Sequence, residues 1–124
     1  MKRPAASSKS LPPALELTCL RALWQLGEGT VHDVRKAVSK ERILAYTTIM
    51  TLLDRLEKRG FVARRKPGRS YIYRPKMSRD TLREHAVKQL LDGFFDGSAD
   101  ALLRYLREPH TDTRAKMLGV RRHP

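Results

Sequence analysis

The sequence has a single cysteine and lacks long apolar runs. Cys19 has no partner in the chain, which excludes an intramolecular disulfide or a thiolate cluster and favours a reducing, cytoplasmic setting. No stretch approaches the roughly 18 apolar residues that a membrane-spanning helix needs, so membrane insertion is not expected. The N-terminal MKRPAASSKS leads into LPPALEL rather than into a continuous apolar segment, which argues against a signal peptide.

Recognisable catalytic motifs are also missing. The sequence contains no HExxH, no Gly-rich phosphate loop, no nucleophile motif and no paired-carboxylate spacing. The four histidines fall on different predicted elements, so each is expected to be a surface residue rather than a metal ligand. We therefore expect no enzyme, no cofactor and no metal site.

Acidic residues are few, and the positive excess is concentrated. The 26 Lys and Arg residues outnumber the 13 Asp and Glu residues, which gives a formal net charge of +13. Residues 55–76 contain nine basic residues and one acidic residue, so this short block carries +8 of the total. This excess predicts a polyanionic partner. Its concentration in one block is not expected of a ribosomal-type protein, in which the basic residues are spread more evenly.

In the first half of the chain, apolar residues recur with helical spacing in three segments, which predicts three helices. Pro12 and Pro13 suit a first helical turn, and the spacing predicts a helix over 13–26 that ends before Gly27. Thr30 is placed to cap a second helix, with Asp33 at its positive end. The expected buried positions of these two helices are Leu17, Leu20, Leu23, Trp24, Val31, Val34, Ala37 and Val38.

The third predicted helix, over 46–59, has two different faces. Ile49, Leu52, Leu53 and Leu56 recur with helical spacing and predict a core side, and Gly60 is expected just past the C-terminus. Thr47, Thr51, Asp54, Arg55 and Lys58 share the opposite side. Threonines lower helix propensity, so their use in the first turns calls for another explanation.

After Gly60 the period changes from about 3.6 to 2. FVARRK and SYIYRP flank the turn dipeptide Pro67-Gly68 and predict a two-stranded hairpin over 61–74. Pro75 is expected to end the second strand. A fourth helix is predicted from Ser78, and a short fifth helix is predicted to end at Pro109.

Three helices followed by a basic hairpin are typical of a winged helix-turn-helix, in which the third helix enters the DNA major groove and the hairpin lies on the backbone. The fold class is thus mainly α with a small β-hairpin wing, followed by a helical dimerisation segment. The predicted domains are a flexible basic arm over 1–11, a DNA-binding domain over 12–76, the dimerisation segment over 77–108 and a flexible basic tail over 109–124.

A threonine face would let the third helix approach base edges closely, because its side chains are short and offer both a hydroxyl and a methyl group. Arg55 is the best single candidate for a guanine or phosphate contact. The alternative is that Thr47 is an N-cap and that the other threonines are merely solvated. Asp54 is expected to orient Lys58 rather than to read a base. The predicted DNA-binding residues of this helix are Tyr46, Thr47, Thr48, Thr51, Arg55 and Lys58.

The hairpin is expected to neutralise phosphates with the basic side chains clustered at its tip, unless these form only a solvated loop. The predicted DNA-binding residues of the wing are Arg64, Arg65, Lys66, Arg69 and Tyr71.

The apolar content of 82–106 is high for so isolated a segment. The simplest explanation is that these apolar side chains are buried against a second copy of the chain. The alternative is that they pack on the same chain's first three helices. The predicted dimerisation residues are Leu82, Leu90, Leu91, Phe94, Phe95, Leu102, Leu103 and Leu106.

AYTTIMTLLDRLEKRGFV followed by GRSYIYRP resembles the signature of the penicillinase repressor family, the BlaI/MecI/CopY-type transcriptional repressors. The resemblance covers about residues 14–108. It implies a homodimer that binds a dyad operator near a promoter and blocks transcription, and it places Thr47, Thr48, Thr51 and Arg55 at recognition-helix positions. A sequence-neutral architectural DNA- or RNA-binding protein is the alternative.

Three departures from that family concern induction and the C-terminus. Penicillinase-type members are inactivated by cutting at an Asn-Phe bond after a membrane sensor-protease acts, but this sequence contains no Asn. Copper-responsive members carry Cys-x-Cys pairs, and here Cys19 is alone. The family's usual C-terminal amphipathic helix is replaced by a Pro-interrupted basic tail. The inducing sensor or protease therefore stays unknown.

Overall fold

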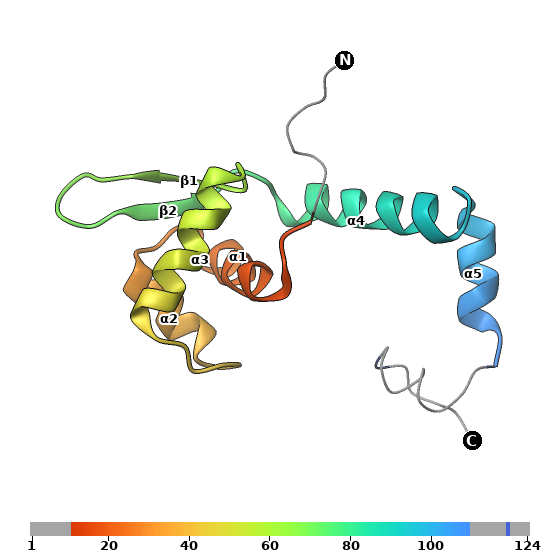
Figure 1. The fold of residues 1–124 in the computed structure, drawn as a ribbon, viewed down its shortest axis with the longest axis horizontal. Helices are drawn as coiled ribbons and strands as arrows, with labels where there is room; N and C mark the ends of the chain where they lie inside the picture. The colour runs from red at the N-terminus through yellow and green to blue at the C-terminus, as the bar shows by residue number, and fades with distance from the viewer. Residues whose placement is uncertain (1–10, 110–118, 120–124) are drawn as a thin grey trace, which may run out of the picture. The chain divides into compact units, whose positions relative to one another are not determined.

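A computed structural model describes residues 11–109 and residue 119 of the chain. The predicted arm before residue 11 and most of the predicted tail lie outside the described residues. The contacts divide the chain within α4, between Ala86 and Val87, into a winged-helix unit and a C-terminal unit. In chain order the elements are α1 (Ala14–Leu26), α2 (Val31–Val38), α3 (Tyr46–Lys58), β1 (Val62–Arg65), β2 (Ile72–Pro75), α4 (Arg79–Phe94) and α5 (Ala99–Arg107) (Figure 1).

The first two helices begin where the sequence predicts. Pro13 precedes α1, and the Thr30 hydroxyl accepts a hydrogen bond from the Asp33 N–H at 3.2 Å. The Asp33 carboxylate accepts in return from the Thr30 N–H at 2.9 Å, so the two residues form a reciprocal capping box. That bond from the Thr30 backbone holds the pKa of the Asp33 carboxyl below its usual value. Thr30 is thus confirmed as the N-cap of α2.

The C-terminus of α3 forms a Schellman motif. The Phe61 N–H donates to the Leu56 carbonyl at 2.9 Å, and the Gly60 N–H donates to the Glu57 carbonyl at 3.1 Å. Gly60 has a φ of 85°, a left-handed conformation that side chains with a Cβ rarely adopt. Leu56 and Phe61 are both buried, which adds the apolar contact typical of this motif. The predicted position of Gly60 is confirmed.

Replacing Gly60 by Ala should lower the free energy of unfolding by about 1 kcal/mol, because a Cβ disfavours the left-handed conformation. An added Cβ meets nothing within 4 Å, so the expected loss comes from the backbone rather than from a clash. Urea unfolding followed by Trp24 fluorescence measures it. Gly68→Ala is the matched control: a Cβ there also meets nothing within 4 Å and φ is not left-handed, so a comparable loss would contradict this explanation.

The wing is a two-stranded antiparallel hairpin that is tied to the helical core. Its register pairs Val62 with Pro75 and Arg65 with Ile72. Gly29, in the turn between α1 and α2, adds a bridge: its N–H donates to the Tyr73 carbonyl at 2.9 Å and its carbonyl accepts from the Tyr73 N–H at 2.8 Å. A Cβ on Gly29 would lie 2.9 Å from the Asp33 Cβ, so glycine fits this close approach.

The core of the winged-helix unit joins all three helices, the wing and the start of α4. The four predicted core residues of α3 are at most 5% exposed, which confirms that face. Cys19 is also buried, and burial raises the pKa of its thiol to about 12. The largest fully buried side chains are those of Tyr73, Leu20, Leu23, Ile49, Leu53, Leu56, Val34 and Val62.

Two predicted domain boundaries differ from the structure. Leu11, assigned to the flexible arm, packs against the core, and the winged-helix unit continues past residue 76 to Ala86. The Trp24 indole N–H donates to the Met77 carbonyl at 2.9 Å and fixes the segment that leads into α4. Leu82 is only 5% exposed in the same core. Its assignment to a dimer surface is therefore wrong, because the side chain already has its apolar partners within the chain.

The C-terminal unit contains the end of α4, a tight turn and α5. Asp96 and Gly97 both have positive φ, of 51° and 77°, and the Gly97 N–H donates to the Leu91 carbonyl at 2.9 Å. The Ser98 hydroxyl then caps α5 by accepting from the Ala101 N–H at 3.0 Å. The rings of Phe95 and Tyr105 meet edge to face with centroids 5.5 Å apart, and this contact joins the turn to α5.

Candidate nucleic-acid interface

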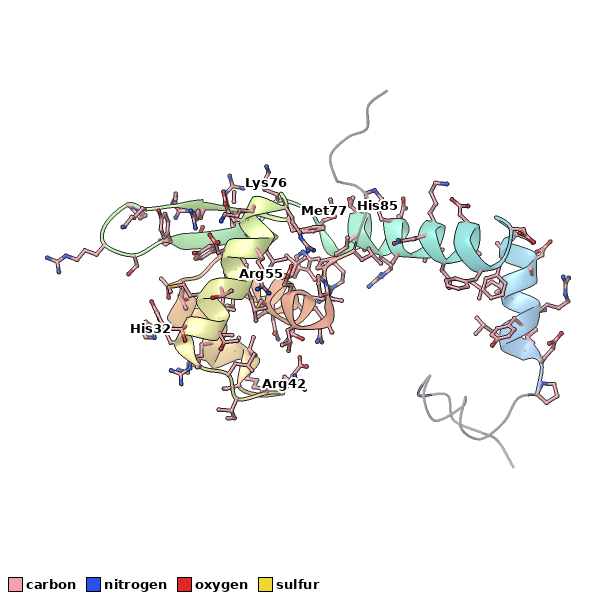
Figure 2. All side chains as sticks on the ribbon, in the orientation of Figure 1. His32, Arg42, Arg55, Lys76, Met77 and His85 are labelled. Carbon is pink, nitrogen blue, oxygen red and sulfur yellow. The ribbon has the colours of Figure 1, made fainter. Side chains whose placement is uncertain are left out.

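The side of α3 opposite the core is exposed and carries most of the predicted recognition residues. Tyr46, Thr47, Thr51, Arg55 and Lys58 are exposed, and Thr48 is half-buried. The helix begins at Tyr46 after Ala45, which occupies the N-cap without a side-chain bond. The alternative that Thr47 is the N-cap is thus wrong, since Thr47 lies inside the first turn. Figure 2 labels Arg55 on α3, Arg42 beyond the end of α2 and His32 on α2.

Asp54 lies on this exposed face and binds two basic side chains. One carboxylate oxygen is 3.2 Å from the Lys58 Nζ, and the other accepts a hydrogen bond from the Arg64 Nη1 at 3.3 Å. The predicted pair with Lys58 is confirmed. The pair with Arg64 connects α3 to strand β1, and the helical period alone could not reveal it because the two residues lie on different elements.

The basic residues of the wing do not form one cluster at its tip. Arg64 and Arg65 belong to strand β1, whereas Lys66 and Arg69 lie in the connecting segment. The guanidinium of Arg64 stacks over the Tyr71 ring at 4.3 Å, and the Lys66 ammonium lies 5.0 Å from the same ring. Tyr71 is therefore the platform on which two of the predicted wing cations lie.

Arg65 binds the turn between α1 and α2. Its two terminal nitrogens donate to the two carboxylate oxygens of Glu28 at 2.9 and 3.1 Å, which is a bidentate pair. The hydrogen bond from Arg65 holds the pKa of the Glu28 carboxyl below its usual value. No role for Glu28 is predicted from the sequence. Its position between two turn glycines, and before the residue that bridges to the wing, was the available signal.

A groove of about 480 Å³ lies between the N-terminal part of α2, the exposed face of α3 and the wing. The rings of His32 and Tyr46 meet at its α2 side with centroids 4.7 Å apart, so His32 belongs to this surface although no function was predicted for it. Three of the five predicted wing residues and two of the six recognition-helix residues line the groove: Arg64, Arg69, Tyr71, Tyr46 and Thr51.

The predicted dimerisation residues other than Leu82 lie on the last turns of α4, in the following turn and on α5. Phe94 is 79% exposed, and Leu103 and Leu106 are 47% and 50% exposed. Leu91, Phe95 and Leu102 are half-buried. The exposed apolar surface of this unit also includes Val87 and Leu90. An exposed apolar surface of this kind is typical of a site that is buried against another molecule.

Other kinds of site find no support in the described part of the chain. No three His, Cys, Asp or Glu side chains among residues 11–109 come together in a way that could hold a metal ion. No helix in the same range has the length and apolar composition needed to cross a bilayer.

The family model described as "Penicillinase repressor" matches residues 13–117. The chain belongs to the penicillinase repressor family. The resemblance seen in the recognition helix and wing is thereby confirmed, and the family consists of transcriptional repressors rather than enzymes.

Two relatives and one solved structure show how far this likeness extends. The transcriptional regulator BlaI of Mycobacterium tuberculosis is 34% identical over 76% of this chain and 81% of its own length. The penicillinase repressor of Bacillus licheniformis is 27% identical over 71% of this chain and 69% of its own. The solution structure of the DNA-binding domain of the repressor BlaI superposes with a TM-score of 0.50 at 29% identity, over 59% of this chain and 92% of that domain. The winged-helix fold is thus confirmed.

Proposed function

We propose that this chain represses transcription by binding a specific operator with α3 in the major groove and the wing along the DNA backbone. The observation that carries the proposal is the exposed face of α3, which presents short threonine side chains. The basic wing lies beside this face. The fold and the family agree with it, and the similar BlaI domain is itself named as DNA-binding. A cytoplasmic location follows, because the operator DNA lies there.

Each group of residues has a distinct role in this proposal. Thr47 and Thr51 approach base edges, while Arg55 and Lys58 bind guanine or phosphate at the flank and C-terminal end of α3. Arg69 and Lys66 neutralise backbone phosphates from the wing. Tyr71 holds the wing cations in place through its ring.

A homodimer on a dyad operator is the second part of the proposal. The exposed apolar side chains of α4 and α5 support it, because a partner copy would remove them from water. Two-fold symmetry then places the half-sites one or two helical turns apart, about 34 Å per turn. A site of this kind near the promoter would exclude RNA polymerase.

Selection of bound duplexes from a random pool, followed by footprinting upstream of the chain's own gene, tests the specificity. We expect the selected duplex to be palindromic and to bind about 10³-fold more tightly than a scrambled duplex at the same salt concentration. A ratio near unity would instead indicate a sequence-neutral architectural protein.

Replacing Thr47 and Thr51 by Ala together should lower the ratio of selected to scrambled affinity at least about tenfold, because hydroxyl contacts to base edges are lost. Binding to the scrambled duplex should change little, since no charge is altered. The control is Gln25→Ala, an exposed polar residue of α1 that lines a separate groove with Trp24 and Arg79. If the double variant keeps the full ratio, the threonines only allow the backbone to come close.

A further inference from the structure

Two carboxylates hold two of the four cations that the wing would present to DNA, Arg64 and Arg65. Arg64 and Arg65 are consecutive residues of β1, and successive side chains of a strand point to opposite faces. Arg64 bonds to Asp54 on α3, whereas Arg65 bonds to Glu28 in the turn between α1 and α2. Each arginine is thus tied to a different part of the helical body, and the wing is held from both faces.

Asp54 has the more central position. Its carboxylate lies on the exposed face of α3 and is shared between Arg64 at 3.3 Å and Lys58 at 3.2 Å. The Arg64 guanidinium is also packed over Tyr71, so its side chain has partners on both α3 and the wing and is only 27% exposed. One carboxylate therefore orients a cation of the helix and a cation of the wing on the same surface.

Glu28 engages Arg65 with both oxygens at 2.9 and 3.1 Å. The pair is about half exposed, at 50% for Arg65 and 48% for Glu28. It lies next to the Gly29–Tyr73 bridge that ties the wing to the turn. The pKa of Glu28 lies below its usual value and that of Arg65 above it, so both partners stay charged at neutral pH.

Each carboxylate weakens attraction to phosphate in two ways. It repels the polyanion directly, and it occupies a cation that phosphate would otherwise bind. Binding to random DNA depends almost entirely on phosphate contacts, so it should suffer most. Binding to an operator also gains from base contacts of α3, and phosphate contacts from cations in fixed positions, here Arg64 and Lys58, help to set the register for those contacts.

We infer that Asp54 and Glu28 are selectivity-determining residues, which restrain Arg64, Lys58 and Arg65 and so suppress binding to random DNA. The inference rests on the proposed DNA-binding function and adds to it two acidic positions that oppose indiscriminate binding. It assigns Asp54 a role in selectivity without any contact to a base.

The test compares Asp54→Asn and Glu28→Gln with Glu41→Gln in the full-length protein. All three changes are isosteric and raise the net charge by one. Glu41 pairs with Arg21 on the helical body at 3.2 Å and is 49% exposed, so it matches Glu28 in exposure without touching the wing. The intensity and wavelength of Trp24 fluorescence confirm that each variant is folded. Fluorescence anisotropy then measures affinity for a scrambled duplex and for the duplex selected by the wild-type chain, at several salt concentrations.

Asp54→Asn and Glu28→Gln should each bind the scrambled duplex about threefold or more tightly than wild type, with a salt slope steeper by up to about one unit. Affinity for the selected duplex should rise less, so the specificity ratio falls. Glu41→Gln should change each quantity less than about twofold, since its charge lies away from the wing.

An equal gain in Glu41→Gln would show an effect of total charge and would overturn the inference, as would an unchanged specificity ratio. Failure of the proposed function looks different. In that case the wild-type chain selects no sequence from the pool. The affinities of wild type and variants for the scrambled duplex then test by themselves whether Asp54 and Glu28 restrain the wing.

Discussion

Replacing Leu53 by Ala should lower the free energy of unfolding of the winged-helix unit by about 3 kcal/mol. Leu53 is 0% exposed and lies on the core side of α3, among residues of α1, α2 and the wing. The substitution removes three carbon atoms from this core and leaves a cavity that the neighbouring helices cannot fully close. For a unit of this size such a loss is a large part of the total stability.

Urea unfolding at one fixed protein concentration measures this loss. Trp24 is the only tryptophan of the chain, and its indole N–H is bonded to the Met77 carbonyl, so its fluorescence reports on this unit. Met50→Ala is the control on the same helix, because Met50 is 43% exposed and should lose less than about 1 kcal/mol. Equal losses in both variants would contradict a loss that comes from the core, because Ala favours a helix at least as well as Leu or Met and neither change lowers helix propensity.

Replacing both Phe94 and Leu103 by Asp should abolish the proposed homodimer and weaken operator binding at least about 100-fold. Both side chains are exposed and apolar, at 79% and 47%. In a dimer they would be buried, so each Asp would have to lose its hydration without an opposite charge to compensate. A monomer then binds only one half-site at a time, and the gain from linking two half-sites is lost.

Sedimentation velocity measures the oligomeric state, and anisotropy on full and half operators measures binding. Half-operator affinity should stay at the wild-type level, because the winged-helix unit is unchanged. The control variant, Gln89→Asp with Ala99→Asp, adds the same charge at two exposed positions of α4 and α5 that are not large and apolar. A dimer that persists in Phe94→Asp/Leu103→Asp with wild-type operator affinity would exclude this surface.

The helices and the wing could be predicted because their signals are local. The Thr30–Asp33 cap, the leucine stripe of α3 and Gly60 each act over a few residues, and each is found at its predicted place. Pro67-Gly68 lies, as predicted, in the segment that connects the two strands. Leu82 shows the limit of this reasoning. Leu82 belongs to a helical pattern of apolar residues. That pattern alone does not tell whether the side chain is buried against the same chain or against a second copy.

The ion pairs that join different elements of the interface could not be predicted for a related reason. Lys58 lies four residues from Asp54 on one helix, so their pairing follows from helical geometry. Arg64 and Asp54 approach each other only because the wing packs beside α3, and Arg65 meets Glu28 only because Gly29 and Tyr73 pair across 44 residues (73 − 29). No local pattern encodes these distances.

The sequence by itself determined the order of elements, the two faces of α3, the basic character of the wing and the family resemblance, because periodicity, capping and charge are written in neighbouring residues. Only the tertiary structure decided which cations are already paired, which apolar residues are covered within the chain and where the winged-helix unit ends. The physical reason is that these properties depend on distances between elements, and packing of the whole unit sets those distances.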